Sequence, residues 1–307
     1  MSSSARLLIF VCAALDLVTI SFTTFATKDD LLQNCGTTSV FANHRQGRLR
    51  ESGVSRVVGG IPSPEGSSPW MVSLQLLHPG MGYVGHICGG VLIHQSWVVT
   101  AAHCIKNEKY ALPISHLWSV QFGPELRRFA IKEIVIHEKF AGYNHDIALV
   151  QLSTPAPYVP VCLPKGGQGY LGVRCVASGW SGVPAPNILT RRSGAPGPRA
   201  HVHLTVVSSS VCRNLYLSTY NLTLNAGHLC ASGKGGLTSG TCLGDSGGPL
   251  QCNMADGRWY LAGITAFGSG CGRPGYPDVY TRLAYYLPWI NAQIKNFPTE
   301  DRRKNVL

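Results

Sequence analysis

The segment Gly244-Asp245-Ser246-Gly247-Gly248-Pro249 places a serine inside a turn flanked by glycines. Upstream of it lie Thr100-Ala101-Ala102-His103-Cys104 and Asp146-Ile147-Ala148-Leu149. A serine hydroxyl is a weak nucleophile unless a neutral imidazole takes its proton and a buried carboxylate orients that imidazole. We therefore expect Ser246, His103 and Asp146 to act as nucleophile, base and orienting acid in acyl-transfer chemistry.

The order of these three residues distinguishes between folds. The serine turn also satisfies the G-x-S-x-G elbow of α/β-hydrolases, whose triad runs Ser, acid, His and whose serine is followed by a helix. Here His103 and Asp146 both precede Ser246, and Pro249 follows it. The subtilisin order, Asp then His then Ser, fails as well. The observed order is that of the chymotrypsin template.

Composition and patterning predict an all-β chain. The 307 residues are 45% hydrophobic and 13% charged and include 35 glycines, which favours one large or two small barrels over a helical bundle and argues against disorder. Short apolar or alternating runs between Gly, Pro, Asn and Ser clusters predict strands in Trp70–Leu77, Val91–Ile93, Trp97–Ala101, Ile131–Ile136, Ile147–Leu152, Val202–Val207 and Leu261–Ala266.

Three other segments have their own character. Pro164–Gly172 is rich in proline and glycine and is expected to divide two barrels, whereas Ser181–Pro198 is expected to form an exposed loop. Only the C-terminal end is expected to be helical, because Trp289, Ile290 and Ile294 share one face.

The N-terminus predicts export. Arg6 precedes an apolar stretch from Leu7 to Ile20, and small residues follow up to Ala26, so residues 1–26 are expected to be a cleaved signal peptide; an uncleaved anchor is the alternative. No later segment has the roughly 18 apolar residues of a membrane span. We expect a secreted or secretory-vesicle protein.

The cysteine count agrees with an oxidising compartment. Of eleven cysteines, Cys12 falls in the signal, and an even set of ten remains, which favours disulfides. The ten are Cys35, Cys88, Cys104, Cys162, Cys175, Cys212, Cys230, Cys242, Cys252 and Cys271. No C-x-x-C pair suggests zinc, and we expect neither a metal nor a cofactor. Asn221-Leu222-Thr223 is a candidate glycosylation site.

The formal charge of +11 attracts anionic partners. Basic residues are scattered, and no basic stripe interleaved with aromatic residues suggests nucleic acid. An ordinary solvated surface is the favoured interpretation, and sulfated or sialylated glycoproteins are the more specific hypothesis for an anionic partner.

Residues 56–296 resemble a chymotrypsin/trypsin-family serine protease throughout. The resemblance lies in Arg56-Val57-Val58-Gly59-Gly60, in the three triad motifs and in the ending Pro288-Trp289-Ile290. Within that family the chain most resembles the acrosins, proteases of the sperm acrosome, in Leu112–His116, Ile134–Phe140 and Val202–Leu204. The resemblance implies two six-stranded antiparallel β-barrels with a C-terminal helix and the active site in the cleft between them. It also implies an acrosomal location, protein or peptide substrates and protease inhibitors as partners.

The same resemblance implies a domain plan and a set of bridges. Residues 27–56 are expected to be a propeptide or light chain, 57–296 the serine protease domain, and 297–307 a short basic tail. The implied disulfides are Cys88–Cys104, Cys175–Cys252, Cys212–Cys230, Cys242–Cys271 and Cys35–Cys162, the last tying the light chain to the catalytic chain. Acrosins carry a second light-chain bridge, for which this chain lacks both cysteines.

The family resemblance also implies an activation cleavage and an oxyanion hole. Cleavage after Arg56 would free the amine of Val57, which is expected to pair with Asp245. That pairing is expected to order a loop whose Gly244 and Ser246 N–H groups form the oxyanion hole.

The primary specificity pocket departs from the trypsin pattern. Gly240 stands where trypsin-like enzymes have an aspartate floor, Gly268 keeps the entrance open, and Asp278 stands at a wall position that usually holds glycine. If Asp278 faces the pocket, it pairs with arginine or lysine, and basic or mixed specificity is the favoured reading. If neighbours such as Thr241 shield it, the pocket is short and elastase-like, suited to small aliphatic residues. A catalytically silent basic binding protein on the protease fold is the third alternative.

Overall fold

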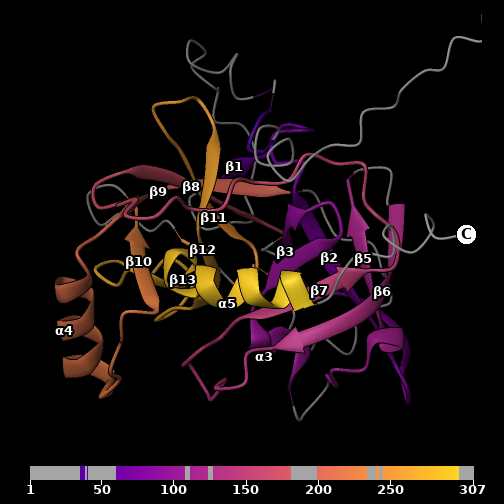
Figure 1. The fold of residues 1–307 in the computed structure, drawn as a ribbon. Helices are drawn as coiled ribbons and strands as arrows, with labels where there is room; N and C mark the ends of the chain where they lie inside the picture. The colour runs from indigo at the N-terminus through magenta and orange to yellow at the C-terminus, as the bar shows by residue number, and fades with distance from the viewer. Residues whose placement is uncertain are drawn as a thin grey trace, which may run out of the picture.

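The computed structural model describes residues 35–38, 40, 60–107, 111–123, 127–180, 199–233, 240–241 and 245–296. Strands dominate these residues and form two barrels that lie side by side (Figure 1). Each expected strand run overlaps a strand of the structure.

The first barrel closes in the order β2-β3-β4-β7-β6-β5, and every pairing is antiparallel. Most of its strands are almost continuously buried, whereas the strand at Arg127–Ile136 is largely exposed or half-buried. They are β2 (Met71–His78), β3 (Gly82–His94), β4 (Trp97–Thr100), β5 (Trp118–Phe122), β6 (Arg127–Ile136) and β7 (Ala148–Leu152).

The second barrel repeats the strand order of the first. Its sheet runs β9-β10-β13-β12-β11-β8, and pairing of β8 with β9 closes it. The two-residue strand β1 (Ile61–Pro62) adds to the edge of β9. The six barrel strands are β8 (Arg174–Gly179), β9 (Ala200–Val206), β10 (His228–Ser232), β11 (Pro249–Asn253), β12 (Trp259–Phe267) and β13 (Asp278–Arg282). The fold is thus the expected pair of six-stranded antiparallel barrels.

The apolar core of the first barrel continues into the contact between the barrels. It contains the fully buried Trp97 and Phe122 and extends to Leu261 and Ile264 of β12. The helix α5 (Leu283–Asn296) joins the same core through Leu283, Tyr286 and Ile290. Because apolar burial contributes about 25 cal/mol per Å², this shared core holds the barrels in a fixed relation.

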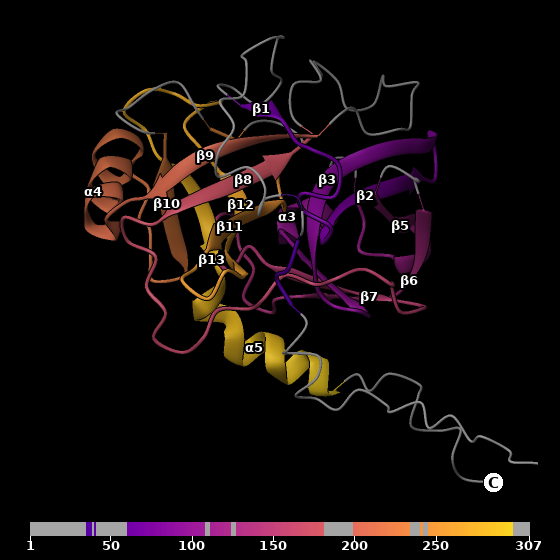
Figure 2. The same cartoon turned by 90° about the horizontal axis from the view of Figure 1, so that it is seen from above.

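The expectation that only the C-terminal end is helical was wrong. A second long helix, α4 (Ser209–Tyr220), lies outside the second barrel, as Figure 2 shows. It buries only Cys212 and Tyr216, while Val211, Leu217 and Tyr220 are exposed, so its apolar side chains do not form one buried face. The disulfide Cys212–Cys230 fastens it to β10 instead.

Two short helices occur in the first barrel, and both adjoin strands. They are α3 (Ala102–Ile105) after β4 and the 3₁₀ turn η2 (Ser115–Leu117) before β5. No helix in the described residues is long and apolar enough to cross a membrane. The predicted loop Ser181–Pro198 lies outside the described residues.

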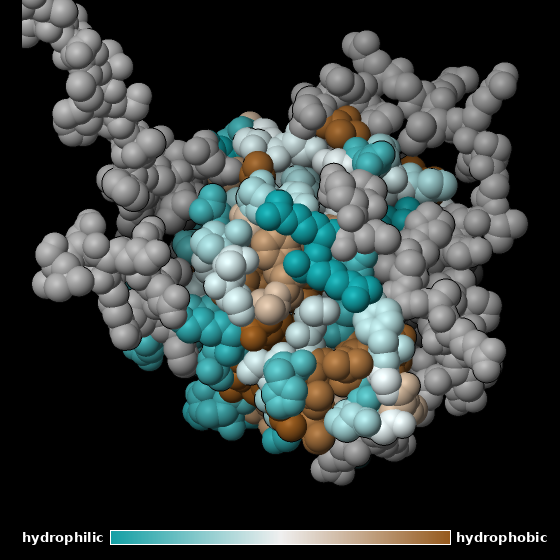
Figure 3. All heavy atoms as spheres, turned by 90° about the vertical axis from the view of Figure 1, so that its right-hand side faces the viewer, coloured by the Kyte–Doolittle hydropathy of each residue, from teal (hydrophilic) through white to brown (hydrophobic). Residues whose placement is uncertain are grey.

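The surface of the first barrel is mixed in polarity. Figure 3 shows its outer face, where hydrophilic side chains gather across the centre and hydrophobic ones lie below them. The exposed Arg127 and Arg128 begin β6 on this barrel, and each guanidinium stacks over an aromatic ring. Part of the positive charge of the chain is therefore carried by two arginines whose positions are fixed by contacts with Phe129 and Tyr83.

Candidate active site

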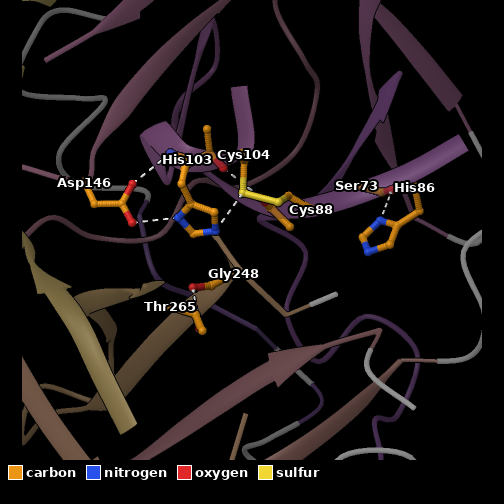
Figure 4. The surroundings of a disulfide bond; sticks show 10 residues. Ser73, His86, Cys88, His103, Cys104, Asp146, Gly248 and Thr265 are labelled. Carbon is orange, nitrogen blue, oxygen red and sulfur yellow. Dashed lines mark hydrogen bonds and ion pairs between the residues drawn. A yellow bond between two sulfur atoms is a disulfide. The ribbon is translucent and has the colours of Figure 1, made fainter. Parts of the chain in front are cut away.

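His103 lies in the single turn of α3, directly after the buried strand β4. The neighbouring Cys104 forms a disulfide with Cys88 of β3, and the Cys104 Sγ is 3.8 Å from the His103 Nε2. In Figure 4 this disulfide and Asp146 stand on opposite sides of the imidazole. The disulfide therefore fixes the backbone next to His103 on one side of the ring, and the Asp146 carboxylate holds the ring from the other side.

Asp146 binds His103 through both carboxylate oxygens. The backbone N–H of His103 donates to Oδ1 at 2.9 Å, and its ring Nδ1 lies 2.7 Å from Oδ2. Because an ionised carboxylate only accepts, this contact places the ring proton on Nδ1 and leaves Nε2 free as a base. Burial opposes the charged imidazole, but the charge and hydrogen bond of Asp146 outweigh it and raise the pKa of His103 above 6.5.

The backbone around Asp146 is shaped for this contact. Asp146 is 3% exposed, and its carbonyl oxygen accepts a hydrogen bond of 2.8 Å from the hydroxyl of Thr281 on β13. The preceding His145 has a φ of 52°, in the left-handed region that few residues other than glycine and asparagine adopt. The first barrel thus supplies the acid, and the second barrel fixes its main chain.

Ser246 lies in the turn before β11 and is partly exposed. Its carbonyl oxygen accepts from the N–H of Gly89 on the first barrel at 2.8 Å, while the N–H of Gly247 donates to Thr265 on the second at 2.8 Å. Gly89 follows Cys88, whose disulfide reaches the residue after His103. These bonds place the serine turn at the contact between the barrels, on the same side as the histidine.

Two glycines in this region are required by close approach. Gly247 has a φ of 76°, and a Cβ there would lie 2.3 Å from the Thr100 Oγ1. A Cβ at Gly179, on β8, would lie 1.7 Å from a carboxylate oxygen of Asp245. Asp245 is 1% exposed, so its charge needs a polar partner. Val57, the predicted partner, lies outside the described residues together with Arg56, Gly244 and Cys242.

A buried polar pair on β2 and β3 was not predicted from the sequence. The His86 Nδ1 lies 2.6 Å from the Ser73 Oγ, and the His86 ring contacts the tilted ring of Trp180, the residue after Gly179, at 5.0 Å between centroids. Figure 4 draws the first of these contacts. One of eleven histidines carries little information alone, and only the position of His86 two residues before Cys88 could have singled it out.

The four residues predicted for the specificity pocket come together. Asp278 is 3% exposed, and its Oδ2 accepts from the N–H and the hydroxyl of Thr241 at 2.6 and 3.0 Å. A Cβ at Gly240 would lie 2.6 Å from that Oδ2, and a Cβ at Gly268 would lie 2.9 Å from Oδ1. The Asp278 carboxylate therefore lies between Gly240, the expected floor of the pocket, and Gly268, its expected entrance.

Burial dominates the titration of this carboxylate. It raises the pKa of Asp278 to about 7, against the lowering effect of the two bonds from Thr241, and the charge of Asp245 raises it further. Near neutral pH both the neutral and the ionised forms of Asp278 are populated.

An aromatic pocket beside the triad was also missed. Phe267, at the end of β12, packs against Tyr143 at 4.5 Å and Tyr216 at 5.9 Å between ring centroids. With Tyr220 and Asn221 these residues line a cavity of about 460 Å³. Tyr143 is three residues before Asp146, which is the only sequence signal that could have placed it here.

Four of the five implied disulfides are formed within the described residues: Cys35–Cys162, Cys88–Cys104, Cys175–Cys252 and Cys212–Cys230. Cys271 is also disulfide-bonded, and its implied partner Cys242 lies outside the described part. Among described residues, one trio of metal-ligand atoms converges within 4.8 Å, that of Cys88, His103 and Cys104. Two of these ligands are disulfide sulfurs, which lack the thiolate a metal requires.

The comparisons with known proteins concern the whole barrel pair. A model of the Trypsin family matches residues 57–290. Transmembrane protease serine 7 of Mus musculus is 35% identical over 258 residues, which cover 78% of this chain and 28% of that protein. Ovochymase-2 of Mus musculus is 34% identical over 275 residues, which cover 82% of this chain and 42% of that protein.

The chain spans less than half the length of these curated relatives. Neither of them is an acrosin, so the matches support the family and not the acrosin subclass. The match over 57–290 and the barrel pair lead to one conclusion: this chain belongs to the trypsin family of serine proteases.

Proposed function

We propose that this chain is a secreted serine endopeptidase, made as a zymogen, that hydrolyses peptide bonds with Ser246, His103 and Asp146. The observation that carries the proposal is the double contact of Asp146 with the backbone and ring of His103. It leaves Nε2 able to take the proton of Ser246 as the hydroxyl attacks the scissile carbonyl, and to return it to the leaving amine.

The oxyanion hole is proposed to be the N–H groups of Gly244 and Ser246. As the carbonyl carbon becomes tetrahedral, its oxygen gains negative charge, and donors aimed at that charge are each worth about 10²–10³ in rate. The serine turn supports this role because Gly247 and Gly248 are held by backbone bonds to Thr265 and Asp245.

Activation is proposed to follow cleavage between Arg56 and Val57. The new α-amine would neutralise the carboxylate of Asp245, which is buried and packed against the Cα of Gly179. A cation or hydrogen-bond donors stabilise a buried carboxylate, and the new amine would supply both.

The specificity is proposed to be mixed. The Asp278 carboxylate shortens the pocket between Gly240 and Gly268, which favours small aliphatic side chains, while its free Oδ1 offers a basic side chain an acceptor when ionised. The first effect favours elastase-like cleavage and the second favours the basic preference of an acrosin-like enzyme. The pKa of about 7 gives both forms a share at neutral pH.

Secretion, an acrosin-like role and the partners belong to the same proposal. Disulfides support an oxidising compartment, and the acrosin-like segments named above support residence in a secretory vesicle such as the acrosome. The proposed partners are protein or peptide substrates, protease inhibitors and anionic glycoproteins, the last attracted by the charge of +11.

Cleavage of a positional fluorogenic peptide library by the Arg56-activated protein tests this proposal, with Ser246→Ala as the control. Turnover above the control after Arg, Lys, Ala or Val is the expected result. No turnover above the control would favour the alternative, a catalytically silent binding protein on the protease fold.

A further inference from the structure

The aromatic pocket described above has a modification sequence on its rim. The helix α4 ends at Asn221, which takes a left-handed φ of 52° and belongs to the pocket lining. Its backbone N–H donates to the Leu217 carbonyl at 3.0 Å, so its position is fixed by the helix end. Asn221 and Thr223, the two recognition positions of an Asn-x-Thr sequence, are both exposed.

The pocket itself is open and aromatic. Tyr143 and Tyr220 are 53% and 43% exposed, although their rings lie against other aromatic residues on one side. Tyr220 is held in place because the Arg273 guanidinium donates to its hydroxyl at 2.8 Å. Exposed aromatic faces of this kind are apolar surfaces with a polar edge, and a ligand that offers both CH groups and hydroxyls fits them.

We propose that Asn221 carries an N-linked glycan whose first sugars cover the mouth of this pocket. The glycan would begin on a residue that lines the pocket, within reach of the exposed rings of Tyr143 and Tyr220. This inference rests on the proposed export of the chain, because glycan transfer occurs in the secretory pathway.

The covered pocket would select substrates. It begins at Phe267 and Gly268, two and three residues after Thr265, which binds the serine turn. Gly268 lines this pocket and also adjoins Asp278, so a peptide whose side chain fills the primary pocket would pass beside its mouth. A glycan over the mouth therefore excludes bulky side chains there, while the primary pocket near Asp278 stays open.

The experiment compares the exported protein with two variants at one position outside the pocket lining. Thr223→Ala destroys the acceptor sequence and keeps Asn221, while Thr223→Ser keeps the acceptor. Loss of a glycan mass on treatment with peptide N-glycosidase F is expected for the unaltered protein and Thr223→Ser, and not for Thr223→Ala. Absence of that mass from the unaltered protein would overturn the proposal.

Nitration with tetranitromethane then tests the cover without relying on catalysis. Tyr143 and Tyr220 should react several-fold faster in Thr223→Ala than in Thr223→Ser, whereas Tyr285, which is 49% exposed on α5, should react equally in both. Equal nitration of Tyr143 and Tyr220 in the two variants would overturn the proposal even in an inactive protein.

Peptide cleavage completes the test. Thr223→Ala should raise kcat/KM several-fold for peptides with Trp or Tyr upstream of the cleaved residue and leave it unchanged for substrates that fill only the primary pocket. The protein could cleave no peptide and still carry the glycan mass and show slower nitration of Tyr143 and Tyr220. In that case the proposed protease activity fails and this inference stands.

Discussion

Asp146 contacts both the backbone and the ring of His103, so one substitution can move the ring proton without moving the ring. In Asp146→Asn the side-chain carbonyl can still accept from the His103 N–H, but the amide group then faces Nδ1 as a donor. The ring proton must move to Nε2, where it blocks the base. We expect kcat to fall about 10⁴-fold, the loss known for this change in the chymotrypsin-type triad. Steady-state cleavage of the preferred peptide measures it, and a loss below tenfold would count against the assigned roles.

The pH dependence of activity follows from the protonation of His103. The base must be neutral to act, and Asp146 raises the pKa of His103 above 6.5. Activity should therefore rise with pH through a midpoint above 6.5. A pH profile of kcat/KM for a small aliphatic substrate tests this; a midpoint below 6.5 would contradict it.

Asp278 gives specificity its own pH dependence. Its carboxylate attracts a cationic side chain only when ionised, and its pKa is about 7. The ratio of kcat/KM for an arginine substrate to that for an alanine substrate should rise as pH increases through about 7, because the titration of His103 cancels in the ratio. Asp278→Asn should flatten the profile. A flat ratio in the unaltered enzyme would mean that Thr241 shields the carboxylate from substrate.

At this scale motif and chain order predicted Ser246, His103 and Asp146, and the family resemblance predicted a pocket of four residues. The structure places Asp146 against His103 and groups Gly240, Thr241, Gly268 and Asp278. The sequence could not locate His86, Tyr216 or Tyr220, since these residues gain their neighbours only when distant strands and α4 pack together. The sequence could not predict the depth of the primary specificity pocket either, because that depth depends on where the Asp278 carboxylate lies between Gly240 and Gly268.

Among the elements, the serine turn depends on its fit against two barrels. In Gly247→Ala a methyl group would lie 2.3 Å from the Thr100 Oγ1 and 2.5 Å from the Gly89 carbonyl oxygen. We expect the turn to shift and activity to fall by at least about 10²-fold, the effect of one lost oxyanion donor. Gly142→Ala is the matched control, because its φ of 55° is also left-handed but nothing lies within 4 Å.

The control should lose about 1–2 kcal/mol of stability and keep its activity, since left-handed backbone strain is then its only cost. Thermal unfolding and peptide cleavage of both variants give the comparison. Equal activity losses in the two would show that backbone strain, and not the contact between turn and barrel, explains the effect.

The strands were predictable because buried β-branched and aromatic runs bounded by glycine and proline have few other solutions. The helix α4 was not predicted, because polar and apolar side chains are mixed along it and it is fastened by the Cys212–Cys230 bridge and the buried Tyr216 rather than by a broad buried face. A covalent anchor can replace the apolar stripe on which recognition of a helix depends.

At the scale of the whole molecule, the Cys35 segment is built into the second barrel. The Gly36 N–H donates to the Pro160 carbonyl at 2.8 Å, its carbonyl oxygen accepts from Trp259 at 2.9 Å, and Cys35 is bonded to Cys162. After cleavage at Arg56 the light chain should remain covalently attached. Denaturing gels should therefore show one band without reductant and two with it, whereas Cys35→Ser should give two bands in both. One reduced band after trypsin treatment would contradict cleavage at this junction.

The central claim is that the two barrels assemble a reactive serine once the chain is cut after Arg56. Fluorophosphonate labelling before and after that cleavage, with the labelled residue identified by mass spectrometry, tests it most directly. We predict rapid labelling of Ser246 only in the cleaved protein, and none in cleaved His103→Ala or in uncleaved Arg56→Gln. Slow labelling of cleaved protein, or equal labelling of the His103→Ala variant, would contradict the account.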